Sequence, residues 1–160
     1  MSQIQEEIRQ HKPFQSPAHK AAVSLLRTSN LLVRHYTAVV GRRDITLQQY
    51  NVLRILRGAS PTGLPTLDIG DRMVEQTPGI TRLLDRLEKK QLVLRERSST
   101  DRRQVMVRIT SAGLELLAQL DAPVNDADLT GMATLDGARL SQLQELLDQI
   151  RDGLHQILDE

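Results

Sequence analysis

Apolar side chains recur every three or four positions early in the chain, which is the period of one face of an α-helix. The stripe comprises Ala22, Leu25, Leu26, Leu32, Val33, Tyr36, Val39 and Val40. Ser16-Pro17 precedes it, and a serine N-cap followed by proline at the first helical position is typical of a helix start. The pattern predicts a long helix that ends near Gly41.

Two shorter helices are expected next. Thr46 precedes Gln49 by three positions, the spacing of a capping box, and this predicts a helix that ends near Arg57. A third helix is expected over residues 64–72, which contain Leu64, Leu67 and Ile69.

A fourth helix is expected over residues 78–90, because Thr77-Pro78 repeats the pattern of a cap followed by proline. Its apolar residues follow the spacing i, i+3, i+4, i+7 of one buried stripe: Ile80, Leu83, Leu84 and Leu87. The opposite face is polar and carries Thr81, Arg82, Asp85, Arg86 and Lys89.

The apolar period then shortens to two, which is typical of strands. Residues 92–97 and 105–109 are the expected strands, and the polar loop between them carries Arg102 and Arg103. Two short strands are marginal in water, so the hairpin must pack against the helices.

Helices resume after Thr110, with one expected over 111–120, an interruption at Pro123, a short helix or loop over 124–134, and a last helix over 136–158. The last helix has apolar residues at alternating spacings of three and four, the seam of a coiled coil. This surface, with the N-terminal Ile4 and Ile8, exceeds what one small domain covers and predicts a homodimer. The expected dimerisation residues are Ile4, Ile8, Leu140, Leu143, Leu147, Ile150, Leu154 and Ile157.

The predicted fold is mainly α with a small β-hairpin: a winged helix-turn-helix flanked by dimerisation helices. One continuous domain is expected, with residues 1–44 and 111–160 serving dimerisation and residues 45–110 binding DNA. The helix over 78–90 would enter the major groove, where arginine reads guanine. The expected DNA-binding residues are Thr77, Pro78, Gly79, Thr81, Arg82, Asp85, Arg86, Arg97, Asp101, Arg102 and Arg103.

Charge is unevenly distributed along the chain, although the net charge is only +1. Residues 77–108 hold nine Lys or Arg against four Asp or Glu, whereas residues 110–160 hold two against ten. A basic middle segment is a candidate polyanion contact. The alternative is that Arg82 and Arg86 simply pair with Asp85 and Glu88 on a solvated helix.

The amino-acid composition excludes or disfavours several kinds of binding site and of cellular location. Aromatic residues make up 2% of the chain, which disfavours stacking of single-stranded bases. The absence of cysteine excludes disulfides and thiolate zinc sites, and His11, His19, His35 and His155 form no ligand-spaced cluster, so neither metal nor cofactor is expected. No apolar run is long enough for a membrane span and the polar start lacks a signal peptide, so the expected location is the cytoplasm.

The pattern resembles the MarR (multiple antibiotic resistance regulator) family over about residues 18–158. The matching segments are Leu47–Leu53, Gly79–Lys90, Asp101–Arg103 and Ile109–Gly113. The resemblance implies a triangular dimer, with Arg103 in the minor groove and Asp101 shaping the wing arginine network. One residue departs from the family pattern, because Gln91 stands where the family has glycine, which suits a left-handed helix end.

Family members respond to small aromatic or phenolic acids, so the resemblance makes Arg34, His35 and Tyr36 candidates to line a ligand pocket. The alternative is that Tyr36 only packs on the apolar stripe of its helix.

The predicted function is a sequence-specific double-stranded DNA-binding regulator, a ligand-responsive repressor acting as a dimer on a palindromic operator. The alternative is a helical dimeric protein-interaction module that does not bind DNA. An enzyme is not expected, because the sequence has no Gly-rich phosphate loop, no metal cluster and no nucleophile elbow.

Overall fold

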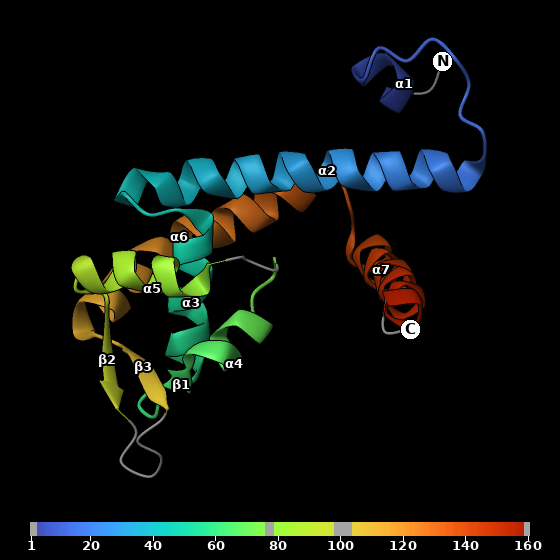
Figure 1. Cartoon of the computed structure of the whole chain (residues 1–160). Coiled ribbons are helices and arrows are strands. Elements are labelled where there is room, and N and C mark those ends of the chain that lie inside the picture. The colour runs from blue at the N-terminus through green and yellow to red at the C-terminus, as the bar shows by residue number, and fades with distance from the viewer. Residues whose placement is uncertain (1–2, 76–78, 98–103, 159–160) are drawn as a thin grey trace. The chain divides into compact units, whose positions relative to one another are not determined.

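The computed structural model describes residues 3–75, 79–97 and 104–158 of the chain. The chain forms two compact units, Met1–Val124 and Asn125–Glu160, each of which is described by itself. The elements in order are α1 (Gln3–Glu7), α2 (Pro17–Val40), the 3-10 helix η1 (Gly41–Arg43), α3 (Leu47–Gly58), β1 (Leu64–Pro65), α4 (Thr66–Asp71), α5 (Ile80–Lys89), β2 (Val93–Arg97), β3 (Val105–Ile109), α6 (Ser111–Met132) and α7 (Gly137–Leu158) (Figure 1). The predicted boundaries at residues 44 and 110 separate dimerisation segments from a DNA-binding region by their expected function, and they stay a prediction.

The starts of α2 and α3 confirm the predicted caps. The hydroxyl of Ser16 accepts a hydrogen bond from the backbone N–H of His19 at 3.0 Å, with Pro17 in the first turn. Thr46 and Gln49 form the full capping box: the Gln49 N–H donates to Thr46 Oγ1 at 3.2 Å, and the Thr46 N–H donates to Gln49 Oε1 at 3.1 Å. Both starts were readable because these hydrogen bonds are local in sequence.

The third predicted element is part strand and part helix. Leu64 and Pro65 form the short strand β1, which pairs antiparallel with β3 through Leu64 opposite Val107. The sheet therefore has the order β1-β3-β2, rather than two strands alone. A two-residue strand has no visible period, so the sequence pattern did not separate it from the helix that follows.

Helix α5 begins two residues later than predicted. Gly79 is its N-cap, with φ of 92°, and no side chain of the described residues forms a cap hydrogen bond. Glycine adopts this left-handed conformation without steric cost, so the chain enters the helix at Gly79. The predicted cap, Thr77, and its neighbour Pro78 lie outside the described residues.

Helix α6 continues through Pro123, which was expected to interrupt it. Leu120, one turn before Pro123, and Leu117, nearly two turns before it, are fully buried, and Ala127 is buried one turn after it. Side chains packed on both sides hold the helix together even though proline removes one backbone hydrogen bond.

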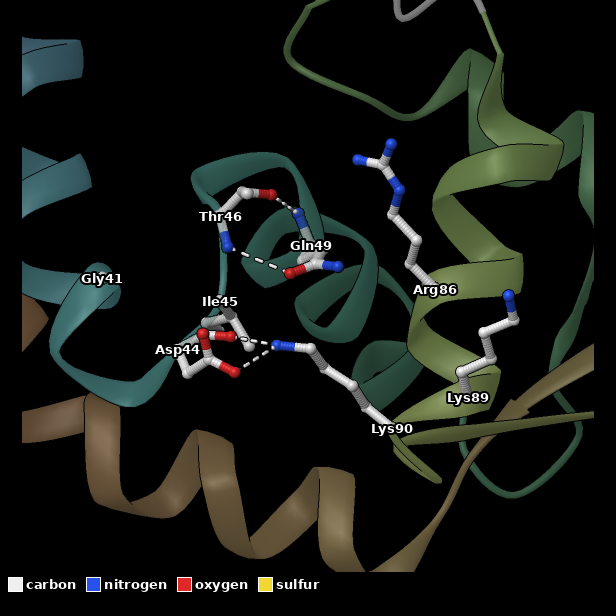
Figure 2. A pocket seen from close by; sticks show the side chains of 8 residues that line it. All are labelled: Gly41, Asp44, Ile45, Thr46, Gln49, Arg86, Lys89 and Lys90. Carbon is white, nitrogen blue, oxygen red and sulfur yellow. Dashed lines mark hydrogen bonds and ion pairs between the residues drawn. The ribbon is translucent and has the colours of Figure 1, made fainter.

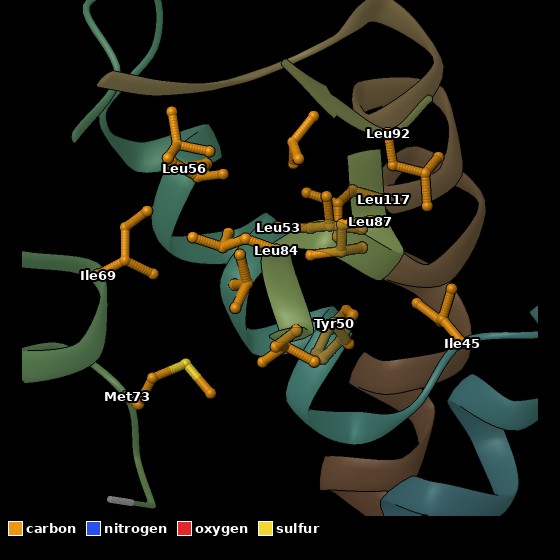
Figure 3. Packing of buried hydrophobic residues seen from close by; sticks show 14 of the residues in the cluster. Ile45, Tyr50, Leu53, Leu56, Ile69, Met73, Leu84, Leu87, Leu92 and Leu117 are labelled. Carbon is orange, nitrogen blue, oxygen red and sulfur yellow. The ribbon is translucent and has the colours of Figure 1, made fainter. Parts of the chain in front are cut away.

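The core of the first unit is mostly aliphatic and includes Tyr50. Leu53 and Leu56 of α3, Leu84 and Leu87 of α5, and Leu117 of α6 are completely buried within one cluster (Figure 3). Gly113 lets α6 pass close to the start of β2, because a Cβ there would lie 2.4 Å from the carbonyl oxygen of Leu92. The helices α3 and α5 are thus fixed to the sheet by contacts from several elements.

Candidate nucleic-acid interface

Helix α5 has two contrasting faces. Leu83, Leu84 and Leu87 are buried, and Ile80 packs partly buried against the same core, as the stripe predicts. Arg82 and Arg86 lie four residues apart on the outer side and are exposed, and Lys89 extends this row by three residues. Residues at these spacings share one face of a helix, so the core contacts turn a cationic face outward.

The acidic residues of α5 are engaged by a strand rather than by their helical neighbours. Arg95 of β2 donates from Nη1 to Asp85 Oδ1 at 2.6 Å and from Nη2 to the carbonyl of Thr81 at 3.0 Å. Its Nη1 also lies 3.7 Å from Glu88 Oε2. The alternative pairing of Arg82 and Arg86 with these carboxylates is wrong within the described residues, because neither arginine forms an ion pair there.

Asp85 therefore connects α5 to the wing. It was predicted as a DNA-binding residue, and its half-buried carboxylate is occupied by Arg95. Charge-assisted hydrogen bonds of this kind fix orientation as well as adding energy. The structure thus gives Asp85 a positioning role between α5 and β2, and a direct contact with DNA stays a prediction.

Helix α5 ends in a left-handed conformation even though Gln91, and not glycine, occupies the position after its C-cap. Gln91 has φ of 59°, in the left-handed region, and its N–H donates to the Glu88 carbonyl at 2.8 Å. The N–H of Leu92 donates to the Leu87 carbonyl at 3.0 Å, which completes a Schellman motif. The Gln91 carbonyl also accepts from Thr110 Oγ1 at 2.8 Å. Glutamine therefore adopts the geometry usually given to glycine, held by these bonds.

The wing is built from β2 and β3, which pair in register from Val93 opposite Ile109 to Arg97 opposite Val105. Arg97 is exposed at the far end of β2. Arg108 donates from Nε to the carbonyl of Thr62 at 3.1 Å, which fastens β3 to the turn before β1. Asp101, Arg102 and Arg103, predicted at the wing tip, lie outside the described residues.

Two further lysines contribute to this surface. Lys89, which the sequence placed on the polar face of α5 but not among the DNA-binding residues, continues the row of Arg82 and Arg86. Lys90 donates from Nζ to Asp44 Oδ2 at 2.7 Å and also to the Asp44 carbonyl. This hydrogen bond and the ammonium charge hold the pKa of the Asp44 carboxyl below its usual value. No sequence signal joins residues 46 positions apart.

The candidate ligand residues lie along the C-terminal half of α2. Arg34 is exposed, and His35 and Tyr36 are half-buried, with ring centroids 6.0 Å apart. A hollow of about 500 Å³ lies nearby in the same unit but is lined by other residues, from Gly41 to Lys90. A ligand role for the three stays a prediction.

The candidate dimerisation residues are partly or largely exposed. Leu140, Leu143 and Leu147 of α7 are half-buried, whereas Ile150, Leu154 and Ile157 are 45%, 50% and 69% exposed. At the other end of the chain Ile4 is half-buried and Ile8 is 36% exposed.

Residues 3–75, 79–97 and 104–158 contain no helix that is both long and apolar enough to span a bilayer. Within the same ranges, no three His, Asp or Glu side chains are grouped closely enough to hold a metal ion.

Comparison with known proteins agrees with this geometry. The family model described as MarR family matches residues 45–105. The homoprotocatechuate degradative operon repressor of Escherichia coli is 26% identical over 127 residues, which are 79% of this chain and 84% of the repressor. A mutant E. coli MarR solved with operator DNA is 22% identical, with a TM-score of 0.75 over 94% of this chain and 99% of that one, and at this identity the likeness shows the fold alone.

A stronger match comes from the crystal structure of a MarR transcription factor from Planctomyces limnophilus. It is 37% identical in sequence, with a TM-score of 0.66, and the match covers 86% of this chain and 99% of that chain. The identity holds over nearly the whole relative, and the family model falls on the segment that forms α3, β1, α4, α5 and β2. The chain therefore belongs to the MarR family of transcriptional regulators.

Proposed function

We propose that this regulator grips duplex DNA as a homodimer, with α5 of each copy in the major groove and the wing against the adjacent minor groove. The observation that carries the proposal is the outer face of α5. Arg82 and Arg86 are exposed and form no ion pair among the described residues, while Arg95 occupies Asp85 and Glu88 on the flank. Free guanidinium groups on a helix held rigidly by its opposite face can reach bases and phosphates.

The dimer follows from the apolar residues at both ends of the chain. Leu154 and Ile157 of α7 and Ile8 near the N-terminus expose apolar surface that a second copy would cover. A two-fold dimer presents two α5 helices to one side of the duplex, about 34 Å apart, so the operator would be a palindrome. Such a regulator would work where the chromosome is, in the cytoplasm, and its family makes it a regulator rather than an enzyme.

We further propose that the regulator is a repressor that responds to a small aromatic or phenolic acid. The operon repressor among its relatives is named for homoprotocatechuate, an aromatic acid. A ligand held near Arg34, His35 and Tyr36 would favour a population in which the two α5 helices no longer match the spacing of the grooves.

Direct binding measurements test the DNA interface. Arg103→Ala is expected to weaken operator binding by roughly 1–3 kcal/mol, because a wing contact is lost, while Arg82→Ala is expected to relax sequence preference. Binding is measured by fluorescence anisotropy on a duplex that the protein selects from a random pool and on a scrambled duplex. If Arg103→Ala left both affinities unchanged, the wing would not touch DNA. A dimer that bound no duplex at low salt would instead be a protein-interaction module.

A further inference from the structure

A hollow of about 500 Å³ lies beside the C-terminal end of α5 (Figure 2). It is lined by Gly41, Asp44, Ile45, Thr46, Gln49, Arg86, Lys89 and Lys90. These residues come from the turn after α2, from the first turn of α3 and from the last turn of α5. All of them belong to the first unit of the chain.

The hollow is positively charged. Arg86, Lys89 and Lys90 contribute three cations against the single carboxylate of Asp44. That carboxylate is bound to Lys90, whereas Arg86 and Lys89 have no ion pair within the described residues. The start of α3 adds the positive end of a helix dipole at Thr46. The unpaired cations and the helix start together favour the binding of an anion.

A buried amide points to the kind of anion. Gln49 is a buried polar residue, with 4% of its surface exposed. The capping box fixes its orientation, because Oε1 must accept from the Thr46 N–H. The amide nitrogen Nε2 takes no part in the capping box and has no hydrogen-bond partner among the described residues. Figure 2 shows this nitrogen turned toward the side of the hollow where Arg86 lies.

Gln49 Nε2 is not itself shut off from solvent, because among the described residues the buried side-chain polar atom without a hydrogen-bond partner is Arg95 Nε. The Nε2 group therefore opens onto the hollow as a donor for water or for another acceptor. An oxyanion supplies that acceptor, and its charge is matched by the two unpaired cations. Guanidinium, ammonium, an amide N–H and a helix start together are the donor set that proteins use for phosphate. Asp44, the carboxylate that lines the hollow, is paired with Lys90, so its charge is offset and Arg86 and Lys89 are left for an incoming anion.

We propose that this hollow binds a phosphate oxyanion. Two sources have the same chemistry: a backbone phosphate of DNA lying beyond the end of α5, and a free phosphate or phosphorylated small molecule. The first source rests on the proposed function, since Arg86 belongs both to the outer face of α5 and to the hollow. The second source does not depend on DNA binding.

The substitution Gln49→Glu tests the hollow with little change of shape. Glutamate at this position still accepts from the Thr46 N–H, so the capping box is kept, while the donor Nε2 becomes a second carboxylate oxygen. Gln48→Glu is the matched control, because Gln48 is the exposed neighbour on the same helix and is not part of the hollow. Lys89→Gln is a second variant that removes a cation without touching the cap.

The experiment has two arms. In the first, duplex binding is measured at several salt concentrations; Gln49→Glu and Lys89→Gln are each expected to weaken it about tenfold and to reduce the slope of log affinity against log salt by about one, whereas Gln48→Glu changes binding less than about threefold. In the second, inorganic phosphate is titrated into the DNA-free protein by calorimetry. Saturable binding that Gln49→Glu abolishes and Gln48→Glu preserves is expected if a free oxyanion is the ligand.

Each outcome decides the proposal. A loss in the first arm alone assigns the site to the DNA backbone, and a loss in the second alone assigns it to a free oxyanion. If Gln49→Glu and Lys89→Gln behave like Gln48→Glu in both arms, the proposal is overturned. If the wild-type protein binds no duplex at all, the proposed function fails. The phosphate titration still shows, independently of DNA, whether the hollow binds an oxyanion.

Discussion

Helices α5 and α7 carry leucine and isoleucine at the same spacings, but they bury them very differently. Leu84 and Leu87 of α5 are completely buried, whereas Leu154 and Ile157 of α7 are 50% and 69% exposed. In α5 the rest of the chain covers the apolar stripe and leaves a cationic face outside. In α7 the C-terminal part of the stripe, from Ile150 to Ile157, is left exposed. The comparison teaches that periodicity determines which residues share a face, and that only the surrounding structure determines what covers it.

The largest effect on stability is expected in α5. Leu84→Ala would lower the free energy of unfolding by roughly 2–5 kcal/mol, because the cavity forms in a fully packed core. Leu67→Ala is the control, because Leu67 of α4 is 78% exposed and its loss should change stability by less than about 0.5 kcal/mol. Urea unfolding followed by circular dichroism measures both. Equal effects would mean that α5 is not anchored as described.

A charge on α7 tests the other half of the comparison. Leu154→Asp is tolerated in a single copy because the side chain is half exposed, but in a dimer it would bury a carboxylate. Dissociation to monomers and a loss of operator affinity of about 100-fold, near 2.7 kcal/mol, are expected. Sedimentation equilibrium and DNA titration measure the two effects.

The matched control for that variant is Gln156→Asp, which places the same charge two residues along on the exposed helix. It is expected to leave the dimer intact. A Leu154→Asp protein that stayed dimeric would remove this part of α7 from the interface.

A smaller and opposite effect is expected where α5 ends. Gln91→Gly would raise the free energy of unfolding by about 0.5–1 kcal/mol, because glycine adopts the left-handed conformation without steric cost. Thermal unfolding of the two proteins side by side measures it. A destabilised Gln91→Gly protein would mean that side-chain contacts of Gln91 outweigh its backbone conformation.

The sequence predicted those parts of the fold that depend on near neighbours. The caps at Ser16 and Thr46 and the stripe of α5 are set within a few residues of the chain, and each is confirmed. The strand β1 and the continuation of α6 through Pro123 were missed, because both depend on packing against distant segments.

The same distinction applies to the site. The row of Arg82 and Arg86 was readable from helical spacing, whereas the pairing of Arg95 with Asp85 and of Lys90 with Asp44 joins separate elements. Without those pairings the sequence could not show that the acidic residues of α5 are occupied and that its arginines are left unpaired. The tertiary structure therefore decides between a solvated charged helix and an interface for a polyanion.

The measurement that tests the central claim most directly is the mass of the complex between the purified chain and duplex DNA over a range of salt concentrations. The account predicts two chains on each short duplex at low ionic strength, with affinity that falls steeply as salt rises, because the exposed cations of α5 displace counterions. A chain that sedimented as a monomer and bound no duplex at low ionic strength would contradict it.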